Sequence, residues 1–307
     1  MSSSRAGSRP FFLDEYLADR KRLVEDYLDR FLPAEDVAPQ VIHQAMRYSV
    51  FAGGKRIRPI LALAAAEAIG GTLEQVVRFV CALEMIHTYS IIHDDLPAMD
   101  NDDFRRGRLT CHRRFSDGIA ILAGNGLMTL AFHLLAEEDE DHPGLARTQL
   151  HVIRQLCRAV GTERGVIAGQ VVDLTTQGQP FTATDLEFIH SSKTGSLIEA
   201  SVSCAALLCG GDESVLSRFR QFGMKVGLAF QIVDDILDVT ATSEELGKTA
   251  GKDHEVRKAT YPALYGLDKS HSEAARLVDE AVQAIDFLGD DGIALAELAR
   301  FVTVRRF

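Results

Sequence analysis

The chain has 307 residues and a formal net charge of −11, with 46% hydrophobic and 25% charged residues. This composition is ordinary for a water-soluble globular protein long enough to bury a large core, and we expect no stable membrane insertion. The acidic balance argues against nucleic-acid binding, because recognition of a phosphate backbone needs a basic face.

The first ten residues, rich in serine and arginine, lack the apolar segment of a signal peptide. We therefore expect a disordered leader over residues 1–10 and one domain over residues 11–307. The five cysteines are scattered and form no CxxC pair, which fits a reducing compartment. These features together predict a cytoplasmic protein.

Apolar residues recur at three- and four-residue spacing along almost the whole chain, which predicts helices. The predicted helices span residues 13–31, 38–51, 59–69, 73–96, 118–136, 145–160, 163–175, 184–209, 212–240, 271–287 and 291–305. No run alternates with a period of two, so we expect no sheet. Because no low-complexity linker divides the chain, the sequence predicts a single all-α domain.

Two clusters of aspartates interrupt apolar helical stretches. They comprise Asp94, Asp95 and Asp100 in the first and Asp234, Asp235 and Asp238 in the second. Adjacent carboxylates in an apolar segment repel each other and are costly to desolvate unless a cation lies between them. With no cysteine or histidine at ligand spacing, hard oxygen ligands and Mg²⁺ are expected. Two such clusters facing one another would clamp a highly anionic group, and diphosphate is the leading candidate.

Helix geometry orients the acids of each cluster. Asp234 and Asp238 are four residues apart, about 40° around a helix, so both face one way. Asp94 and Asp100 are six residues apart and would point about 240° apart on a straight helix. Pro97 interrupts that helix, so we expect a bulged turn that brings Asp100 back beside Asp94.

Basic side chains and one histidine supply the counter-charge. Lys55 and Arg58 stand beside the flexible pair at residues 53–54, which lets cations approach a phosphate closely. His87 lies two helical turns before Asp94, about 20° off its line, so it should face the same cleft. Further positive charge for two diphosphates comes from Arg105, Arg106, Lys193, Lys248 and Lys258.

Five strings carry a family resemblance: GGKRIRP, IHDDLPAMD, RRG, KTG and FQIVDDILD, which begin at residues 53, 92, 105, 193 and 230. In order and spacing across residues 51–262 they resemble the trans-isoprenyl diphosphate synthases. The two extra residues 97–98 in the first cluster are similar to bacterial farnesyl diphosphate synthases and the related geranylgeranyl enzymes. Such a set is far more specific than any single motif.

The resemblance implies an isoprenoid synthase bundle around a deep central cavity, usually a homodimer, that elongates allylic diphosphates with isopentenyl diphosphate. It implies three Mg²⁺ ions with substrate bound, held by Asp94, Asp100 and Asp234 and supported by Asp95 and Asp238. The implied catalytic residues are Asp94, Asp95, Asp100, Lys193, Asp234 and Asp235. The metal ions, Arg105, Lys193 and Lys248 would hold the allylic diphosphate, with Thr194, Gln231 and Lys258 nearby. Lys55, Arg58, His87 and Arg106 would bind isopentenyl diphosphate, and Gln170 and Asp173 would support the site.

Product length rests on Tyr89, which lies five residues before Asp94 and about 7.5 Å deeper along the helix. The resemblance implies that a bulky residue here forms a floor that stops growth early, so we expect the fifteen-carbon farnesyl diphosphate. Two alternatives are a geranylgeranyl diphosphate synthase and a Tyr89 that is only a core or interface aromatic. Asn125 stands where the family usually has an aspartate, which could alter the support of the cleft.

Three other classes fit the sequence less well. A terpene cyclase shares the bundle but needs no isopentenyl pocket and usually carries an Asn/Ser/Glu motif in place of the second cluster. An inactive regulatory subunit of a prenyl synthase tends to lose aspartates, whereas this chain keeps both clusters. A di-iron carboxylate bundle would need Glu-x-x-His pairs, which are missing.

Overall fold

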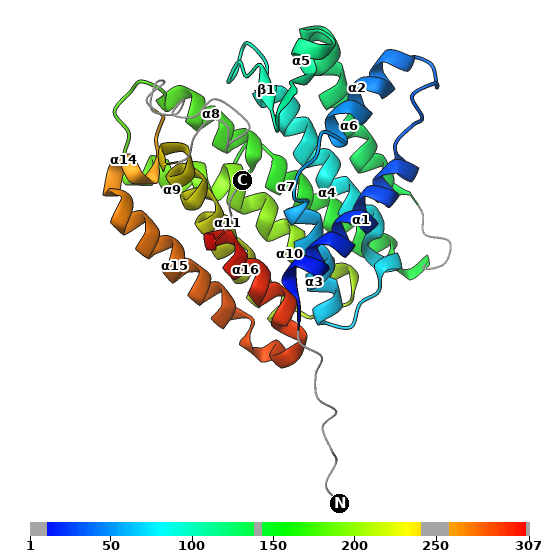
Figure 1. Cartoon of the computed structure of the whole chain (residues 1–307). Coiled ribbons are helices and arrows are strands. Elements are labelled where there is room, and N and C mark those ends of the chain that lie inside the picture. Colours follow the sequence, from blue (N-terminus) through cyan, green and yellow to red (C-terminus); the bar gives the residue numbers. More distant parts are fainter. Residues whose placement is uncertain (1–10, 138–142, 241–257, 305–307) are drawn as a thin grey trace, which may run out of the picture.

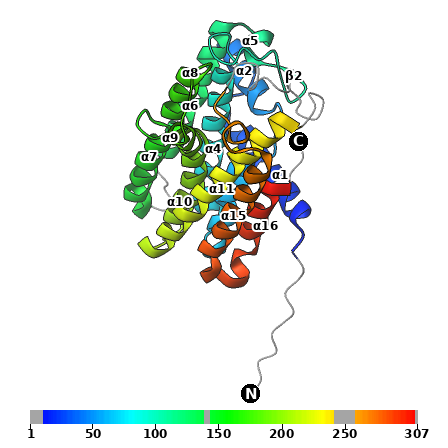
Figure 2. The same ribbon diagram turned by 90° about the vertical axis from the view of Figure 1, so that its left-hand side faces the viewer.

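The computed structural model describes residues 11–137, 143–240 and 258–304, which fold as a bundle of helices (Figure 1 and Figure 2). Its longer helices are α1 (Leu13–Phe31), α2 (Gln40–Val50), α3 (Ile57–Ala68), α4 (Leu73–Asp94), α6 (Asp117–Ala136), α7 (Ala146–Val160), α8 (Val166–Thr176), α10 (Ser196–Leu208), α11 (Glu213–Thr240), α15 (Leu267–Ala284) and α16 (Ile293–Val304). The shorter elements are β1 (Phe104–Arg105), β2 (Arg108–Leu109), α5 (Cys111–Arg114), η1 (Pro143–Leu145), α9 (Ala183–Ile189), η2 (His190–Gly195), α14 (Tyr261–Tyr265) and η3 (Asp286–Gly292). The all-α prediction is confirmed.

Helix α10 is the centre of the core, with every residue buried except Glu199 and Leu207. A helix that is apolar or small on all sides is stable only when other helices surround it. Helices α3, α7 and α11 pack against it. At Gly223 of α11 the backbones approach so closely that a Cβ atom would lie 2.6 Å from the Cα atom of Glu199. Small residues therefore set the tight spacing of the central layer.

Helices α4 and α11 position the two aspartate clusters. The side chains of Thr72 and Gln75 cap the start of α4, which then runs 22 residues to Asp94. Helix α11 runs 28 residues, and Asp234 and Asp238 lie in its last two turns. Both clusters thus stand at helix C-terminal ends, where the helix dipole adds negative potential. The need for cations is correspondingly greater.

Two departures of the structure from the sequence expectation bear on the site. Strands β1 and β2 pair antiparallel, with Arg105 opposite Arg108, so the prediction of no sheet is wrong there. Two-residue strands are too short to show an alternating pattern. The single helix expected over residues 184–209 is divided by η2, which has the wider turns of a π-helix. That wide segment carries Lys193.

Two described helices, α4 and α6, are long and apolar enough by length and composition to cross a membrane. The buried share of the most apolar window is 67% in α4, as expected of a core helix. The corresponding share in α6 is 39%. Helix α6 instead leaves Ile121 and Leu122 exposed by 43% and 55%. This helix thus presents an apolar outer face.

Candidate active site

The first aspartate cluster closes on itself through a turn after α4. The amide of Asp100 donates to the carbonyl of Asp94 at 2.8 Å, and the amide of Asn101 donates to that of Leu96 at 3.0 Å. These bonds bring Asp100 back beside Asp94, as the sequence predicted. The helix does not bulge past Pro97 but ends at Asp94, two residues before the predicted end.

Burial divides the six aspartates into two groups. Three are partly exposed, namely Asp94, Asp100 and Asp234. Three are buried, namely Asp95, Asp235 and Asp238. The partly exposed group is the set that the resemblance assigns to metal. A carboxylate must reach solvent or substrate to share an ion with it, so this division agrees with that assignment.

Buried Asp95 holds an arginine in place. Its carboxylate accepts from the guanidinium of Arg105 at 2.7 Å, and Asp102 lies 3.4 Å from the same group. Burial raises the pKa of Asp95 to about 6, against the opposing effect of Arg105. Hairpin β1–β2 therefore presents Arg105 beside the first cluster, in the region where a diphosphate is expected.

Buried Asp235 is engaged by groups from three elements. It accepts from the side chain of Gln231 at 3.0 Å and from the backbone amide of Tyr261 at 2.8 Å, and His190 Nε2 lies 3.1 Å away. Gln231 in turn accepts from the hydroxyl of Thr194 at 2.6 Å. Asp235 thus ties α11 to η2 and α14, and in this arrangement it positions neighbouring groups rather than meeting a metal.

Lys193 is held where three helical segments meet. At Gly169 of α8 a Cβ atom would lie 2.4 Å from the backbone nitrogen of Lys193. At Gly227 of α11 a Cβ atom would lie 2.6 Å from the Cα atom of Gly195. Segment η2 is therefore clamped between α8 and α11, and the ammonium of Lys193 donates to Asp173 at 2.7 Å.

Cations from later parts of the chain converge on the first cluster. Desolvation raises the pKa of Asp94, with a smaller contribution from Asp100, while the charges of Lys193, Arg105 and Lys258 oppose that rise. The ammonium of Lys258 lies 3.4 Å from a carboxylate oxygen of Asp100. Lys258 and Asp100 are 158 positions apart in the sequence, so the fold brings distant segments together at this cluster.

A second basic group surrounds His87. Arg58 Nη1 lies 3.3 Å from His87 Nε2. Burial, together with Arg58 and Arg106, lowers the pKa of His87 well below its ordinary value, so the ring is neutral near pH 7. Arg106 donates to the carbonyl of Gly53, and a Cβ atom on Gly54 would lie 2.5 Å from its guanidinium. Gly54 also has a φ of 120°, so both space and backbone require glycine there.

Two basic positions, Lys55 and Lys248, remain. Lys55 is exposed, and its ammonium lies 5.3 Å from the ring centroid of Phe301 on α16. Lys248 lies outside the described residues. The other three isopentenyl-binding candidates, Arg58, His87 and Arg106, form a cluster that does not include Lys55.

Gln170 and Tyr89 bury polar atoms that have no hydrogen-bond partner among the described residues. An unsatisfied buried polar atom is costly, so each marks a place that a ligand or water can satisfy. Tyr89 is 6% exposed and its ring packs edge-on against His93 at 5.7 Å between centroids. Burial, with a smaller effect of Asp94, raises the pKa of its hydroxyl to about 12. Tyr89 is therefore neutral and fixed.

The sequence interpretation missed the structural role of Arg56. Its side chain is 3% exposed, pairs with Glu84 at 2.6 Å and Glu25 at 3.2 Å, and donates to the carbonyl of Val50 at 2.6 Å. Arg56 stands between Lys55 and Arg58 in a run of basic residues, which was a signal that one structural element holds all three. The sequence alone does not show which of these cations is buried. Arg56 anchors the start of the helix that carries Arg58.

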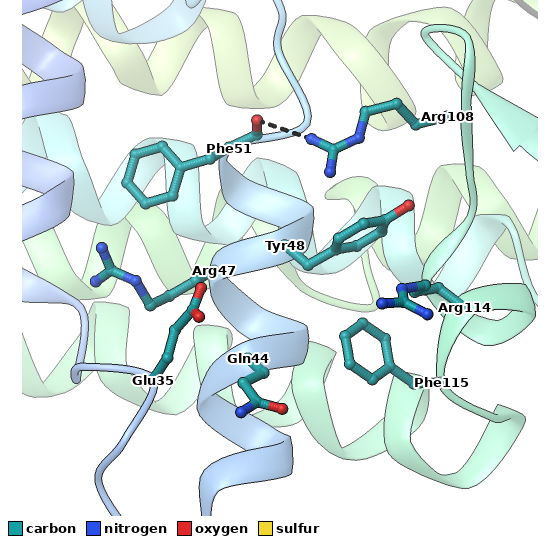
Figure 3. A pocket seen from close by; sticks show the side chains of 8 residues that line it. All are labelled: Glu35, Gln44, Arg47, Tyr48, Phe51, Arg108, Arg114 and Phe115. Atoms are coloured by element: carbon teal, nitrogen blue, oxygen red, sulfur yellow. Dashed lines mark hydrogen bonds between the residues drawn. The ribbon is translucent and has the colours of Figure 1, made fainter.

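Figure 3 shows a pocket of about 350 Å³ between α2 and the segment after β2. None of the described residues predicted for the active site lines it. The deep cavity that the resemblance places between the aspartate clusters stays a prediction.

Comparisons with known proteins agree with this geometry. The sequence profile of the polyprenyl synthetase family matches residues 39–290. The chain is 46% identical over 296 residues to a geranylgeranyl diphosphate synthase of Cyanophora paradoxa, covering 96% of this chain and 97% of that one. It is 42% identical to a farnesyl diphosphate synthase of Geobacillus stearothermophilus, covering 95% and 98%. The crystal structure of a FPP/GFPP synthase from Zymomonas mobilis superposes with a TM-score of 0.84 at 32% identity, covering 95% and 98%.

Proposed function

The chain belongs to the polyprenyl synthetase family, and from this premise we propose that it condenses dimethylallyl and geranyl diphosphate with isopentenyl diphosphate to give farnesyl diphosphate. The chain is a short-chain prenyltransferase; its product is the part that we propose. The observation that carries the proposal is Tyr89, a bulky buried ring on α4 five residues before Asp94. A geranylgeranyl product is the second candidate, favoured by the similarity to the Cyanophora paradoxa enzyme.

The carboxylates suit magnesium shared with a substrate. The partly exposed Asp94, Asp100 and Asp234 offer only oxygen, which Mg²⁺ prefers. Among the residues that the structure describes, no three His, Cys, Asp or Glu side chains could by themselves hold a metal ion. Mg²⁺ commonly takes one or two carboxylates and completes its shell with phosphate oxygens and water. We infer that these three acids would hold up to three ions only together with a diphosphate, whose leaving charge the ions would neutralise.

The remaining cations complete the proposed division of the cleft. Ionisation of an allylic C–O bond places negative charge on the leaving diphosphate, and fixed cations that already point there stabilise it. Lys193, Arg105 and Lys258 lie around Asp94 and fit this role. Arg58 and neutral His87 fit the diphosphate of isopentenyl diphosphate, Arg58 by charge and His87 by a hydrogen bond. The released diphosphate can accept the proton that elimination frees.

The product assignment is tested by one assay. Purified protein is incubated with Mg²⁺, dimethylallyl diphosphate and excess isopentenyl diphosphate, and the dephosphorylated products are separated by chromatography. The proposal expects farnesol as the main product. Geranylgeraniol as the main product would instead favour the second candidate, and no prenyl alcohol at all would contradict both.

Replacing Arg58 with alanine is expected to raise the KM for isopentenyl diphosphate by about tenfold or more, because a charge-assisted hydrogen bond to phosphate is lost. The KM for geranyl diphosphate should change little, since Lys193, Arg105 and Lys258 remain. Steady-state kinetics with each substrate varied in turn measures both values. A rise confined to the allylic KM would overturn this division of the cleft.

We infer that the protein is a homodimer that pairs through α6. The support is its apolar outer face, where Ile121 and Leu122 are exposed and Asn125 lies one turn further along. On this account Asn125 belongs to the subunit interface and not to the support of the cleft. Sedimentation should give twice the chain mass of 33.7 kDa, and Leu122→Glu should shift it toward the monomer. Leu267→Glu, on α15 at the other side of the bundle in Figure 1, should stay dimeric. A monomeric native chain would contradict the inference.

We also infer a cytoplasmic location. All five cysteines are free thiols, three of them buried, which fits a reducing compartment.

A further inference from the structure

The pocket in Figure 3 has walls of arginines and aromatic rings and lies apart from the residues proposed for prenyl transfer. Its floor is the face of α2 that carries Tyr48, and its rim is formed by Arg108 of β2 and by Arg114 and Phe115 at the end of α5. With a volume of about 350 Å³ it is large enough for a small organic molecule.

Arg47 of this pocket is committed to the fold. It forms an ion pair with Asp29, donates to the carbonyl of Leu32 at 3.3 Å, and lies over the ring of Phe51 at 5.3 Å from its centroid. This charge is neutralised within the protein, so Arg47 is a wall of the pocket and not its anion-binding group.

Arg108 and Arg114 have donors left for a ligand. Arg108 makes one long hydrogen bond, 3.4 Å to the carbonyl of Phe51. The guanidinium of Arg114 lies over the Phe115 ring at 5.8 Å from its centroid and makes no hydrogen bond or ion pair with any described residue. Glu35 is the one acid among the described residues that line the pocket. Because a guanidinium fork matches a phosphate group, two such forks against one acid favour a small anion.

The aromatic walls are held rigidly. Tyr48 and Phe115 pack edge to face with centroids 5.5 Å apart, and the hydroxyl of Tyr48 donates to the carbonyl of Leu109 at 2.7 Å. Arg108 lies over the Tyr48 ring at 4.5 Å from its centroid, which holds its guanidinium at the pocket. Figure 3 shows Arg108 and Arg114 on the two sides of Tyr48. Fixed rings beside the held charge of Arg108 and the available charge of Arg114 suit a ligand that has both an apolar part and an anionic end.

We propose that this pocket is a second binding site, separate from the prenyl-transfer cleft, for an organic phosphate. Arg108 and Arg114, on either side of the Tyr48 ring, bind its phosphate, and its apolar or aromatic part lies against Tyr48 and Phe115. Two sources share this chemistry, a prenyl phosphate and a nucleotide. A phosphate bound here replaces the hydrogen bond that Arg108 donates to the carbonyl of Phe51. Arg108 belongs to strand β2, and the paired strand β1 carries Arg105, which contacts Asp95.

The site is tested by calorimetric titration of the whole chain in excess chelator, which removes the metal-dependent part of substrate binding. The probes are geranyl monophosphate, adenosine 5′-monophosphate and inorganic phosphate. The pocket variants are Arg108→Gln and Arg114→Gln. The matched control is Arg113→Gln, on the same short helix, which pairs with Asp103 at 2.9 Å and does not line the pocket. Arg58→Gln is the control for the main cleft.

We expect at least one organic phosphate to bind once per chain, more tightly than inorganic phosphate. The affinity should fall by about tenfold or more in each pocket variant, because a charge-assisted hydrogen bond is lost, and should stay unchanged in both controls. The tighter of the two organic probes identifies the source. Arg114 is exposed and its guanidinium contacts only the Phe115 ring among the described residues, at 5.8 Å from its centroid, so its variant should keep the native melting temperature even if Arg108→Gln does not.

Three results would overturn the proposal: no binding of either organic probe, equal affinity for inorganic phosphate, or binding that survives in Arg114→Gln. Loss of binding in Arg58→Gln would place the ligand in the main cleft and overturn it as well. The outcome is independent of prenyl transfer, because the titration requires no turnover.

Discussion

Replacing Asp94 with asparagine is expected to lower turnover by about 10²- to 10³-fold while leaving the fold as stable as before, or more stable. A fall in turnover of this size is typical when one group that stabilises charge in the transition state is removed. The stability follows from the raised pKa of Asp94, since desolvation makes its charge costly in the free protein. The rate of diphosphate release and the melting temperature of the metal-free protein measure the two effects separately.

Chelation of the metal should abolish the same activity, because neither the carboxylates nor the diphosphate would then be neutralised. The matched control is Asp103→Asn, an exposed acid nearby that pairs with Arg113 and should keep nearly full activity. If the native protein turned over normally in excess chelator, the proposed role of both aspartate clusters would be wrong. Equal losses in Asp94→Asn and Asp103→Asn would indicate a general charge effect instead.

Replacing Tyr89 with alanine is expected to move the product from fifteen carbons to twenty and beyond. The ring is 6% exposed and packs against His93, so its removal leaves a void next to the helix that carries Asp94. A growing chain that starts from a diphosphate at Asp94 can fill this void with a further five-carbon unit. Chromatography of the dephosphorylated products, with excess isopentenyl diphosphate, measures the shift.

Tyr89→Phe tests whether the size of the ring or its hydroxyl determines the product length. It keeps the bulk and removes a buried hydroxyl that has no partner among the described residues, so the product length should not change. A Tyr89→Ala enzyme that still stops at the native length would show that the floor lies elsewhere. The same holds if the native enzyme already makes the twenty-carbon product, since Tyr89 would then permit the step it is proposed to block.

Most of the helical fold could be predicted because its helices are long and bury one face. The predicted span 13–31 is that of α1, and the predicted start of α4 at residue 73 is where its cap begins the helix. Short elements gave no such signal. Hairpin β1–β2 and helix α14 have too few residues for a period to be recognised. In η2 the apolar pattern continues through the wider turn, so the sequence indicated one unbroken helix.

The site could be predicted as a set of residues but not as an arrangement. Spacing placed Asp94 near Asp100, because a proline must interrupt a helix. It could not tell which of the neighbours Asp94 and Asp95 faces the cleft. That distinction depends on Arg105, which reaches Asp95 only because the unpredicted hairpin returns it there. Likewise, the role of Asp235 depends on His190 and Tyr261, which lie on other elements.

The wide turn of η2 makes the chain sensitive to its own length at this point. A π turn takes in one residue more than an α turn while the helices on either side keep their faces. Deletion of one residue within His190–Gly195 would therefore restore regular turns, leave α9 and α10 in register and displace the residues of the turn itself. The ammonium of Lys193 would then leave Asp173, although buried α10 would still present the same face to its neighbours. Homologous chains should therefore vary in residue type along this segment far more readily than in residue number.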